Sequence, residues 1–292
     1  MRILPVASVL ATLLLSACAG MPATHPVPST AIAAETPPAD DSLNATVWFQ
    51  TSVERDLVFR EIYRAAGMRL DAALADKGWD ALPKEDRDND PRALPPAIIV
   101  DVDETVLDNS PNQVRQIRDG SSFNAIDWGR WVNQRAAKAL PGAAEFLRAA
   151  AAKGVTVFYI SNRGADQAAA TFDNLKSAGF PIADGQQFLG EGTVVAGCDQ
   201  QGSAKSCRRR LVGRSYRVLM QFGDQVGDFV RIADNTRDGR REAIAPYLEW
   251  IGDRWWALPN PLYGSWESAV SGKSQDPSAR RAAKEAVLDD AR

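Results

Sequence analysis

Two carboxylates directly follow a short apolar run, and their spacing is the first sign of chemistry. Asp101 and Asp103 come after the residues AIIV (97–100). Charged groups at the end of a buried strand cost free energy unless a cation uses them. A second acid pair, Asp224 and Asp228, follows another apolar run, and a glycine precedes each acid. The two pairs together indicate a site for a hard cation with oxygen ligands, and we expect Mg²⁺.

Each pair also has an ordinary structural explanation. An Asp-rich turn that caps a helix accounts for Asp108 and Ser110, and a Gly-Asp pair after a strand is more often a turn than a ligand. Neither the helix-capping turn nor the Gly-Asp turn explains why two acids immediately follow a buried run. A hydroxyl, an amide and a guanidinium follow the apolar segment 155–160, namely Ser161, Asn162 and Arg163. Such groups can hold phosphoryl oxygens, so we expect a phosphate site beside the cation.

The composition excludes most competing catalytic chemistries. The sequence has 292 residues and one histidine, His25, in a proline-bearing stretch near the N-terminus. A Ser-His-Asp triad, a histidine nucleophile and a His-ligated zinc site all require histidine in the folded part. With 34 Lys plus Arg against 37 Asp plus Glu, we expect no broad surface for a nucleic-acid polymer. Carboxylates, hydroxyls and the side chains of Lys and Arg remain to carry the chemistry.

The hydrophobic pattern predicts the elements that must position these groups. Strand-like segments alternate with helical or polar stretches, and this alternation predicts an α/β fold with a parallel sheet. The strand-like segments are 97–100, 155–160, 216–222 and 255–258, and the clearest helices are 143–152 and 168–178. Functional groups gather at the carboxyl ends of parallel strands. The acid pairs and Ser161 should therefore meet at one edge of the sheet.

The order of these motifs resembles the haloacid dehalogenase superfamily: Asp-x-Asp-x-Thr, Ser-Asn, a Lys, then Gly-Asp-x-x-x-Asp. Four longer stretches narrow the resemblance to the class C acid phosphatases, including the bacterial outer-membrane lipoprotein e type. They are DVDETVLDNS (101–110), WVNQR (131–135), PG (141–142) and LPNPLYGSWE (258–267). The resemblance covers about residues 45–268.

The resemblance implies a Rossmann-like core with a smaller helical part from residues 42–80 and 110–140. It also implies Mg²⁺-dependent hydrolysis of small phosphomonoesters, 5′-nucleotides among them, and a homodimer. One motif departs from the family pattern: the segment GDQVGD (223–228) has Gln and Val where we expect Asn and Leu after the first Asp. Both acids are kept, but the loop beside the metal differs.

The resemblance implies a role for each acid. Asp101 is the expected nucleophile, which becomes an aspartyl phosphate, and Asp103 is the expected acid and then base. The metal would be bound by Asp101, Asp224 and the main-chain carbonyl of Asp103. Asp228 would be a further metal ligand or would support the other ligands.

The phosphate contacts follow from the same resemblance. Ser161 and Lys205 would bind the phosphoryl oxygens. Asn162 belongs to the same phosphate site, where it would chiefly support the loop by hydrogen bonding. Lys176 is the alternative lysine, although its place in a helix indicates a surface residue. For Arg163, a phosphate contact and a position on the surface are equally expected.

Aromatic residues in the matching stretches could bind a base or an aryl ring. Trp131 and Tyr263 are the candidates, with a place in the core or in a dimer interface as an equal alternative. For Trp266 we expect the core or interface instead.

The N-terminus predicts a lipoprotein signal peptide, residues 1–17. The apolar run Val9–Leu15 is too short to span a bilayer comfortably and leads into LSAC, a sequence that looks like a lipobox. Cys18 would then carry the lipid and anchor the protein to a membrane. Ala19 in place of Asp resembles the sorting pattern for the outer membrane. An ordinary secretory signal with an incidental cysteine is the alternative.

The rest of the chain divides by composition. We expect a flexible tether at residues 18–41 and a phosphatase domain at residues 42–273. Residues 274–292 should form a polar tail or a frayed helix. If Cys18 is lipidated, Cys198 and Cys207 remain as an even pair in an oxidising compartment. We expect a disulfide between them, and two free thiols are the alternative.

Two other functions use similar residues. A response-regulator receiver also combines acids, a hydroxyl and a lysine on a parallel sheet, but it is about half this length and has no signal peptide. A surface lipoprotein that keeps the fold and binds nucleotides or a partner without turnover is the second alternative. Intact Asp101 and Asp103 favour the enzyme.

Overall fold

The computed structural model describes residues 42–272, 274 and 276–291. Several predictions lie outside the described residues: the signal peptide 1–17, lipidation of Cys18 and the tether 18–41. Within the described ranges, no helix is both long enough and apolar enough to cross a bilayer.

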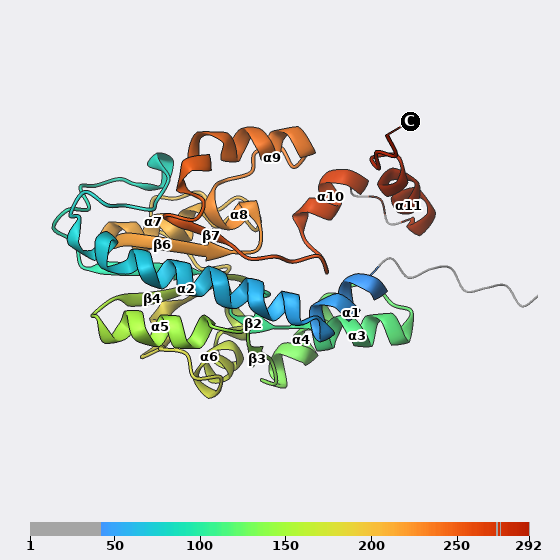
Figure 1. Cartoon of the computed structure of the whole chain (residues 1–292), viewed down its shortest axis with the longest axis horizontal. Coiled ribbons are helices and arrows are strands. Elements are labelled where there is room, and N and C mark those ends of the chain that lie inside the picture. Colours follow the sequence, from blue (N-terminus) through green and yellow to red (C-terminus); the bar gives the residue numbers. More distant parts are fainter. Residues whose placement is uncertain (1–41, 273, 275, 292) are drawn as a thin grey trace, which may run out of the picture. The chain divides into compact units, whose positions relative to one another are not determined.

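The described residues contain a central sheet of five parallel strands in the order β5-β4-β1-β6-β7 (Figure 1). The strands are β1 (Pro96–Val100), β4 (Thr156–Gly164), β5 (Phe188–Glu191), β6 (Arg217–Gly223) and β7 (Trp255–Ala257). A short antiparallel pair, β2 (Leu107–Asp108) and β3 (Lys138–Ala139), lies apart from it. The predicted α/β fold with a parallel sheet is confirmed. The edge strand β5 was not predicted.

Helices surround the sheet and extend beyond its carboxyl edge. They are α1 (Leu43–Thr51), α2 (Val53–Ala75), α3 (Ser110–Asp119), α4 (Ala125–Asn133), α5 (Ala143–Ala152), α6 (Ala168–Ser177), α7 (Ser206–Ser215), α8 (Val226–Phe229), α9 (Arg237–Ile244), α10 (Ser265–Ser271) and α11 (Pro277–Glu285). The predicted helices 143–152 and 168–178 correspond to α5 and α6. The last of the helices, α11, forms within the stretch expected to be a polar tail or a frayed helix.

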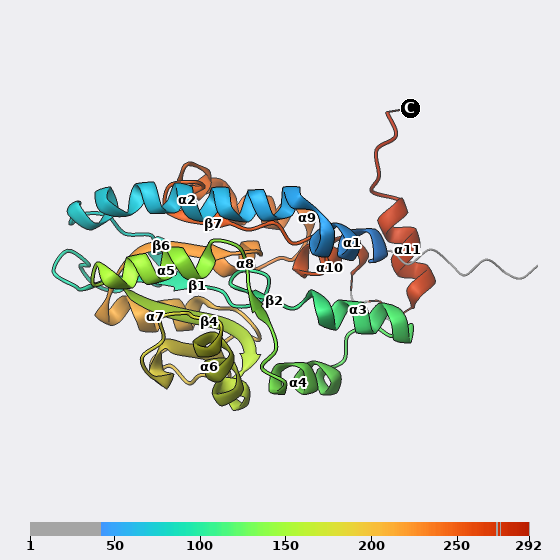
Figure 2. The same ribbon diagram turned by 60° about the horizontal axis from the view of Figure 1, so that its bottom comes forward.

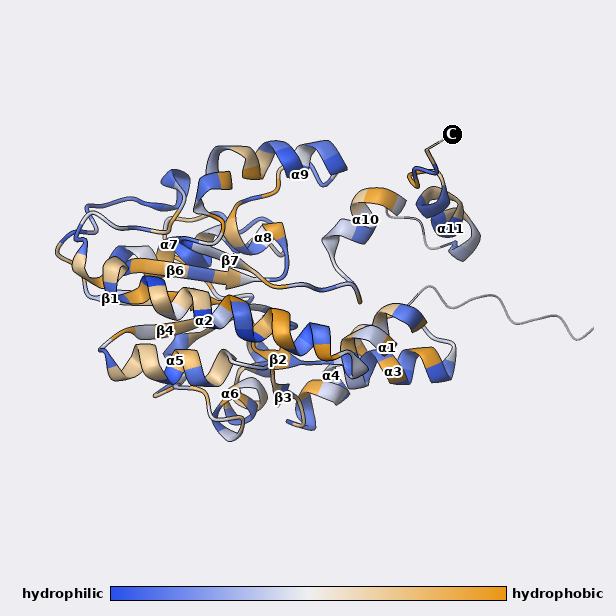
Figure 3. Ribbon diagram, viewed as in Figure 1, coloured by the Kyte–Doolittle hydropathy of each residue, from blue (hydrophilic) through white to orange (hydrophobic). Residues whose placement is uncertain are grey.

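The sheet is buried on both faces, which explains its continuous apolar runs. On one face, Ile98 of β1 and Leu147 of α5 belong to the same core as α2. On the other, Ile99 of β1 belongs to a second core with Val212 of α7 and Phe229 of α8. Figure 2 shows α2 above and α7 below the sheet, and Figure 3 shows β6 mostly in apolar colours.

The carboxyl ends of the central strands are the place where functional groups can gather. Asp101 follows β1, Ser161 lies within β4 near its end, and Asp224 follows β6. The register pairs Val100 of β1 with Tyr159 of β4 and with Phe222 of β6. Asp101, Ser161 and Asp224 therefore lie near the same level of the sheet, as predicted, although β4 itself continues to Gly164.

Candidate active site

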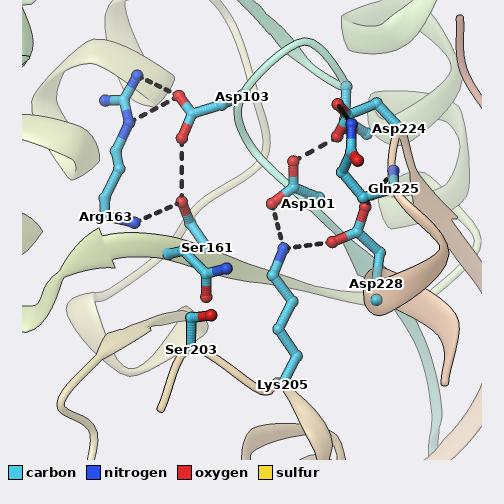
Figure 4. Close-up of polar contacts among 12 residues, drawn as sticks. Asp101, Asp103, Ser161, Arg163, Ser203, Lys205, Asp224, Gln225 and Asp228 are labelled. Carbon is cyan, nitrogen blue, oxygen red and sulfur yellow. Dashed lines mark hydrogen bonds and ion pairs between the residues drawn. The ribbon is translucent and has the colours of Figure 1, made fainter. Parts of the chain in front are cut away.

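Asp101 and Lys205 form the centre of the site (Figure 4). The Asp101 main-chain N–H donates to the carbonyl of Phe222 at 2.9 Å, which fixes the carboxylate at the end of β1. The Lys205 ammonium donates to Asp101 Oδ1 and also pairs with Asp228 Oδ1 at 2.7 Å. Both side chains are buried, Asp101 with 6% and Lys205 with 4% of its surface exposed. The structure thus brings Lys205, and not Lys176 of α6, to the nucleophile expected from the sequence.

Three carboxylates converge closely enough to hold a cation. Asp101, Asp224 and Asp228 each place an oxygen within 4.8 Å of the others. Burial raises the pKa of Asp101 to about 7; Asp228 and Asp103 reinforce this shift, and Lys205 opposes it. Burial, with Asp228 and Asp101 nearby, also raises the pKa of Asp224 well above its usual value. Carboxylates crowded in this way, with oxygen donors only, fit a hard divalent cation such as Mg²⁺.

The side chain of Asp103 is not part of this cluster. Its Oδ1 accepts hydrogen bonds from Arg163 Nε at 2.9 Å and from Asn109 Nδ2 at 2.8 Å. Its Oδ2 accepts from Ser161 Oγ at 3.2 Å. Any metal contact by Asp103 is therefore left to its main chain. The two acids of the DVD motif face different partners, which suits two different chemical roles.

Arg163 is the functional residue whose place the sequence did not predict. Its side chain is buried, with 1% of the residue exposed, and it pairs with Asp103 at 2.8 Å. A surface position, one of the two alternatives for this residue, is wrong. The other, a phosphate contact, stays a prediction: Arg163 lines the cavity, and its guanidinium donates to Asp103, Asn109 and Thr171. The only signal in the sequence was its place directly after Ser161-Asn162.

Ser161 and Asn162 are consecutive residues of β4 that differ in burial. Ser161 is fully buried, and its Oγ accepts from the Arg163 main-chain N–H at 3.0 Å while donating to Asp103. Asn162 is exposed and lines the cavity. Its Oδ1 accepts from Arg208 at 2.8 Å. This bond agrees with the expected supporting role of Asn162, and the phosphate contacts of both residues stay predictions.

Arg208 and a disulfide hold the segment that carries Lys205. Arg208 is fully buried and donates to the carbonyls of Ser161 and of Ser203, the latter at 3.0 Å. Cys207 is joined to Cys198 by a disulfide, so of the two states considered for this pair the structure contains the bonded one. The segment of Lys205 is thereby joined to β4 through Arg208 and to residue 198 through the disulfide.

Gln225, the residue that departs from the family pattern, also supports an acid. Its Nε2 donates to Asp224 Oδ2 at 2.7 Å, and Asn260 Nδ2 donates to the same oxygen at 2.7 Å. Its Oε1 accepts from the Ser265 main-chain N–H at 3.1 Å. The longer amide therefore links the loop of Asp224 to the start of α10.

A cavity of about 720 Å³ opens above these groups. Tyr263 lines it, as expected of a substrate contact, and its hydroxyl donates to Glu104. Glu104, which the sequence analysis did not single out, is fully buried beneath it. Trp266 also lines the cavity and is 39% exposed, so a place in the core is wrong, and a place in a dimer interface stays a prediction.

Trp131 does not line this cavity. It is 3% exposed and lies in the core, and its Nε1 donates to Asn109 Oδ1 at 2.8 Å. The same Asn109 donates to Asp103. The structure therefore places Trp131 behind the acid instead of against a substrate, and Trp128 of α4 lines the cavity in its place.

The family model described as HAD superfamily, subfamily IIIB (Acid phosphatase) matches residues 7–266. The chain belongs to this family. Among solved structures, the class C acid phosphatase from Bacillus anthracis with tungstate bound is 32% identical, with a TM-score of 0.73, and the match covers 85% of this chain and 96% of that chain. A second structure of the same enzyme matches with a TM-score of 0.72. The resemblance to class C acid phosphatases seen in the motifs is confirmed.

Two curated plant proteins match over a shorter length. The stem 31 kDa glycoprotein of Glycine max is 30% identical over 166 residues, and acid phosphatase 1 of Solanum lycopersicum is 26% identical over 170 residues. Each match covers 56% of this chain. The matched part spans 58% and 57% of the length of these two relatives.

Proposed function

We propose that this chain is an acid phosphatase that hydrolyses phosphomonoesters through an aspartyl phosphate on Asp101. The observation that carries the proposal is the convergence of Lys205, Asp224 and Asp228 on a buried carboxylate at the end of β1. The family match supports it. So does tungstate in the Bacillus anthracis relative, because tungstate is a tetrahedral oxyanion like phosphate.

The reaction would proceed in two steps, each using Asp101 and Asp103. In the first, an Asp101 oxygen bonds to phosphorus as the ester P–O bond breaks, and Asp103 gives its proton to the departing alkoxide. In the second, Asp103 takes a proton from a water whose oxygen attacks phosphorus. The Asp101–phosphorus bond then breaks and inorganic phosphate leaves. Lys205 lies where its ammonium can hold the phosphoryl oxygens in both steps.

The positions of Asp103 and Asp101 fit this division. Arg163, Ser161 and Asn109 hold Asp103 apart from the acid cluster, where it can reach the leaving oxygen. Mg²⁺ would be held by Asp101, Asp224 and Asp228 with the main chain of Asp103. It would supply positive charge between the anionic nucleophile and the anionic substrate.

We include 5′-nucleotides among the substrates. Trp128, Tyr263 and Trp266 line the same cavity as Asp101. Flat side chains of this kind bind nucleobases by stacking, and the cavity has the size of an ordinary small-molecule site. Trp131 remains a candidate only through its support of Asn109 and Asp103.

We also propose a lipid anchor at Cys18, a place at the outer membrane and a homodimer. The disulfide between Cys198 and Cys207 supports an oxidising compartment, which agrees with export. Incorporation of labelled palmitate in a bacterial host tests the anchor, and exchange of Cys18 for Ser should abolish it.

Phosphate release tests the enzymatic proposal. p-Nitrophenyl phosphate and AMP are the substrates, assayed with Mg²⁺ and with EDTA. We expect turnover that depends on the metal and that falls at least about 10³-fold in Asp101→Asn, because the nucleophile is lost. Undiminished turnover in that variant contradicts the mechanism. A wild-type chain that binds AMP without releasing phosphate indicates the non-catalytic alternative.

A further inference from the structure

One side of the cavity is formed by a short stretch of chain between β7 and α10. Residues 262–266, with the sequence LYGSW, all line the cavity. We call them the aromatic segment, after Tyr263 and Trp266. Residues 262–264 belong to no helix or strand. The position of the segment therefore depends on contacts with side chains and not on the sheet.

Two side-chain amides hold this segment on either side of Tyr263. Asn260 Oδ1 accepts from the Leu262 main-chain N–H at 2.9 Å. Gln225 Oε1 accepts from the Ser265 main-chain N–H at 3.1 Å and from the Ser265 hydroxyl at 3.2 Å. A main-chain N–H can only donate, so these bonds assign the oxygen of each amide to the aromatic segment. The nitrogen of each amide is then left to donate elsewhere.

Both nitrogens donate to the same carboxylate oxygen. Gln225 Nε2 and Asn260 Nδ2 each lie 2.7 Å from Asp224 Oδ2, and Figure 4 shows Gln225 beside Asp224. Hydrogen bonds to an ionised acceptor are stronger than those between neutral groups. Each amide therefore joins the aromatic segment to one acid of the three-carboxylate cluster.

Gly264 shows how closely the segment lies on Gln225. A Cβ at this position would be 2.3 Å from Gln225 Nε2 and 2.5 Å from Gln225 Oε1. Any larger residue would displace the amide, so the absence of a side chain lets the chain pass directly over it. Asn, which we expected in place of Gln225, is one methylene shorter and would reach less far toward Ser265.

The segment also has contacts that do not involve Asp224. Arg240 of α9 donates to the Ser265 hydroxyl at 2.6 Å, and Asn235 donates to the Ser265 carbonyl at 3.1 Å. The Tyr263 hydroxyl donates to Glu104. Loss of the Gln225 amide should therefore loosen the segment and not release it, and its effect on binding should be severalfold.

We propose that Gln225 is a positioning residue for substrate selectivity, which fixes the ring of Tyr263 relative to the acid cluster and so favours phosphate esters that carry a flat base. This inference rests on the proposed phosphatase function and deepens it. The acid cluster sets where the phosphate lies. A ring held at a fixed place relative to that cluster can stack on a base only at a matching distance from the phosphate.

Equilibrium binding tests this role without turnover. In the full chain carrying Asp101→Asn, with Mg²⁺ present, titration calorimetry compares AMP with ribose 5-phosphate, which lacks the base. We expect AMP to bind about tenfold more tightly. Gln225→Met keeps the length of the side chain without its hydrogen bonds. It should lower this ratio about threefold to fivefold and leave the affinity for ribose 5-phosphate within about twofold.

A second substitution shows whether Gln225 acts through Tyr263. Tyr263→Leu should lower the same ratio, and adding Gln225→Met to it should lower the ratio no further. Asn260→Ala, which removes the other amide, should act in the same direction as Gln225→Met. Gln186→Met is the matched control, because Gln186 is exposed and does not line this cavity.

Three results would overturn the inference. They are equal binding of AMP and ribose 5-phosphate before Gln225 is changed, an unchanged ratio in Gln225→Met, and a further loss from Gln225→Met when Tyr263 is already Leu. An equal loss of affinity for both ligands leaves the ratio unchanged and counts against it as well. Turnover of p-nitrophenyl phosphate by the wild-type chain is measured separately. Its absence would contradict the phosphatase function, and the binding ratios would still decide the role of Gln225.

Discussion

At the scale of single residues, the site separates two neighbouring acids by giving them different partners. Asp101 faces Lys205 and the acid cluster, and Asp103 faces Arg163. Both acids belong to the turn that follows β1, in which Glu104 has a φ of 55° and its main-chain N–H donates to the carbonyl of Leu107. The left-handed backbone conformation costs free energy for residues other than Gly and Asn. The surroundings therefore hold the turn, and the hydrogen bond from Tyr263 to Glu104 is part of them.

Exchange of Arg163 for Lys tests the positioning of Asp103. Lysine keeps the charge but loses the fork of donors that holds Asp103, Asn109 and Thr171 together. We expect kcat for p-nitrophenyl phosphate to fall roughly 10- to 100-fold with a much smaller change in KM, because proton transfer is affected more than binding. Arg135→Lys, at an exposed pair with Asp173, is the control. An unchanged kcat in Arg163→Lys would show that Asp103 does not need this partner.

Exchange of Trp131 for Phe separates its two possible roles. Phenylalanine keeps an aromatic ring but cannot donate to Asn109. Since a lost hydrogen bond at a buried site costs roughly 1–3 kcal/mol, we expect the free energy of unfolding to fall by about that amount. The KM for AMP should stay within about twofold. A large rise in KM with unchanged stability would instead support a direct substrate contact.

At the scale of elements, the sequence was most informative where a strand is buried on both faces. The runs that became β1, β4 and β6 are continuous and apolar, so both the strands and the acids at their ends could be predicted. The edge strand β5 is short and has the sequence FLGE, which gives little periodicity. Helix α11 is polar, and composition alone could not show that it packs against α10.

The same contrast holds within the site. Asp101, Asp224 and Lys205 could be placed from motif and strand order, because the sheet brings strand ends together. The partners of Arg163 and the burial of Trp131 depend on how α4 and the loop after β4 pack. That packing cannot be predicted from the spacing of residues in the sequence.

Removal of the disulfide tests the segment before α7. Lys205 lies inside the loop that Cys198 and Cys207 close. On the chain-entropy model, a loop of this length stabilises the fold by roughly 2–3 kcal/mol. In the variant with Ser at both positions we expect a loss of that order in the free energy of unfolding. We also expect a severalfold higher KM for p-nitrophenyl phosphate, because the lysine is held less firmly. Reduction of the wild-type disulfide by dithiothreitol should reproduce both effects. A KM equal to that of the oxidised wild type would show that Arg208 and the ion pairs alone position Lys205.

At the scale of the whole described unit, the cores on both faces of the sheet hold three carboxylates closer together than their charges favour. Lys205 pairs with two of them, Asp101 and Asp228, while Asp224 is held by the amides of Gln225 and Asn260. The fold therefore carries an electrostatic cost at the end of its central strands. A bound divalent cation would offset it.

Metal binding should consequently stabilise the folded chain. A ligand that binds only the folded state raises the free energy of unfolding by RT ln(1 + [L]/Kd), or about 2.7 kcal/mol at a hundred times Kd. We expect Mg²⁺ to raise Tm by several degrees in the wild type and EDTA to reverse the change. Asp224→Asn should remove the response to Mg²⁺ and, because it relieves repulsion, should raise the Tm of the metal-free chain. Asp253→Asn, at an exposed pair with Arg69, should keep the full response. If Mg²⁺ stabilises Asp224→Asn as much as the wild type, the cation binds elsewhere, and the three-carboxylate cluster is not its site.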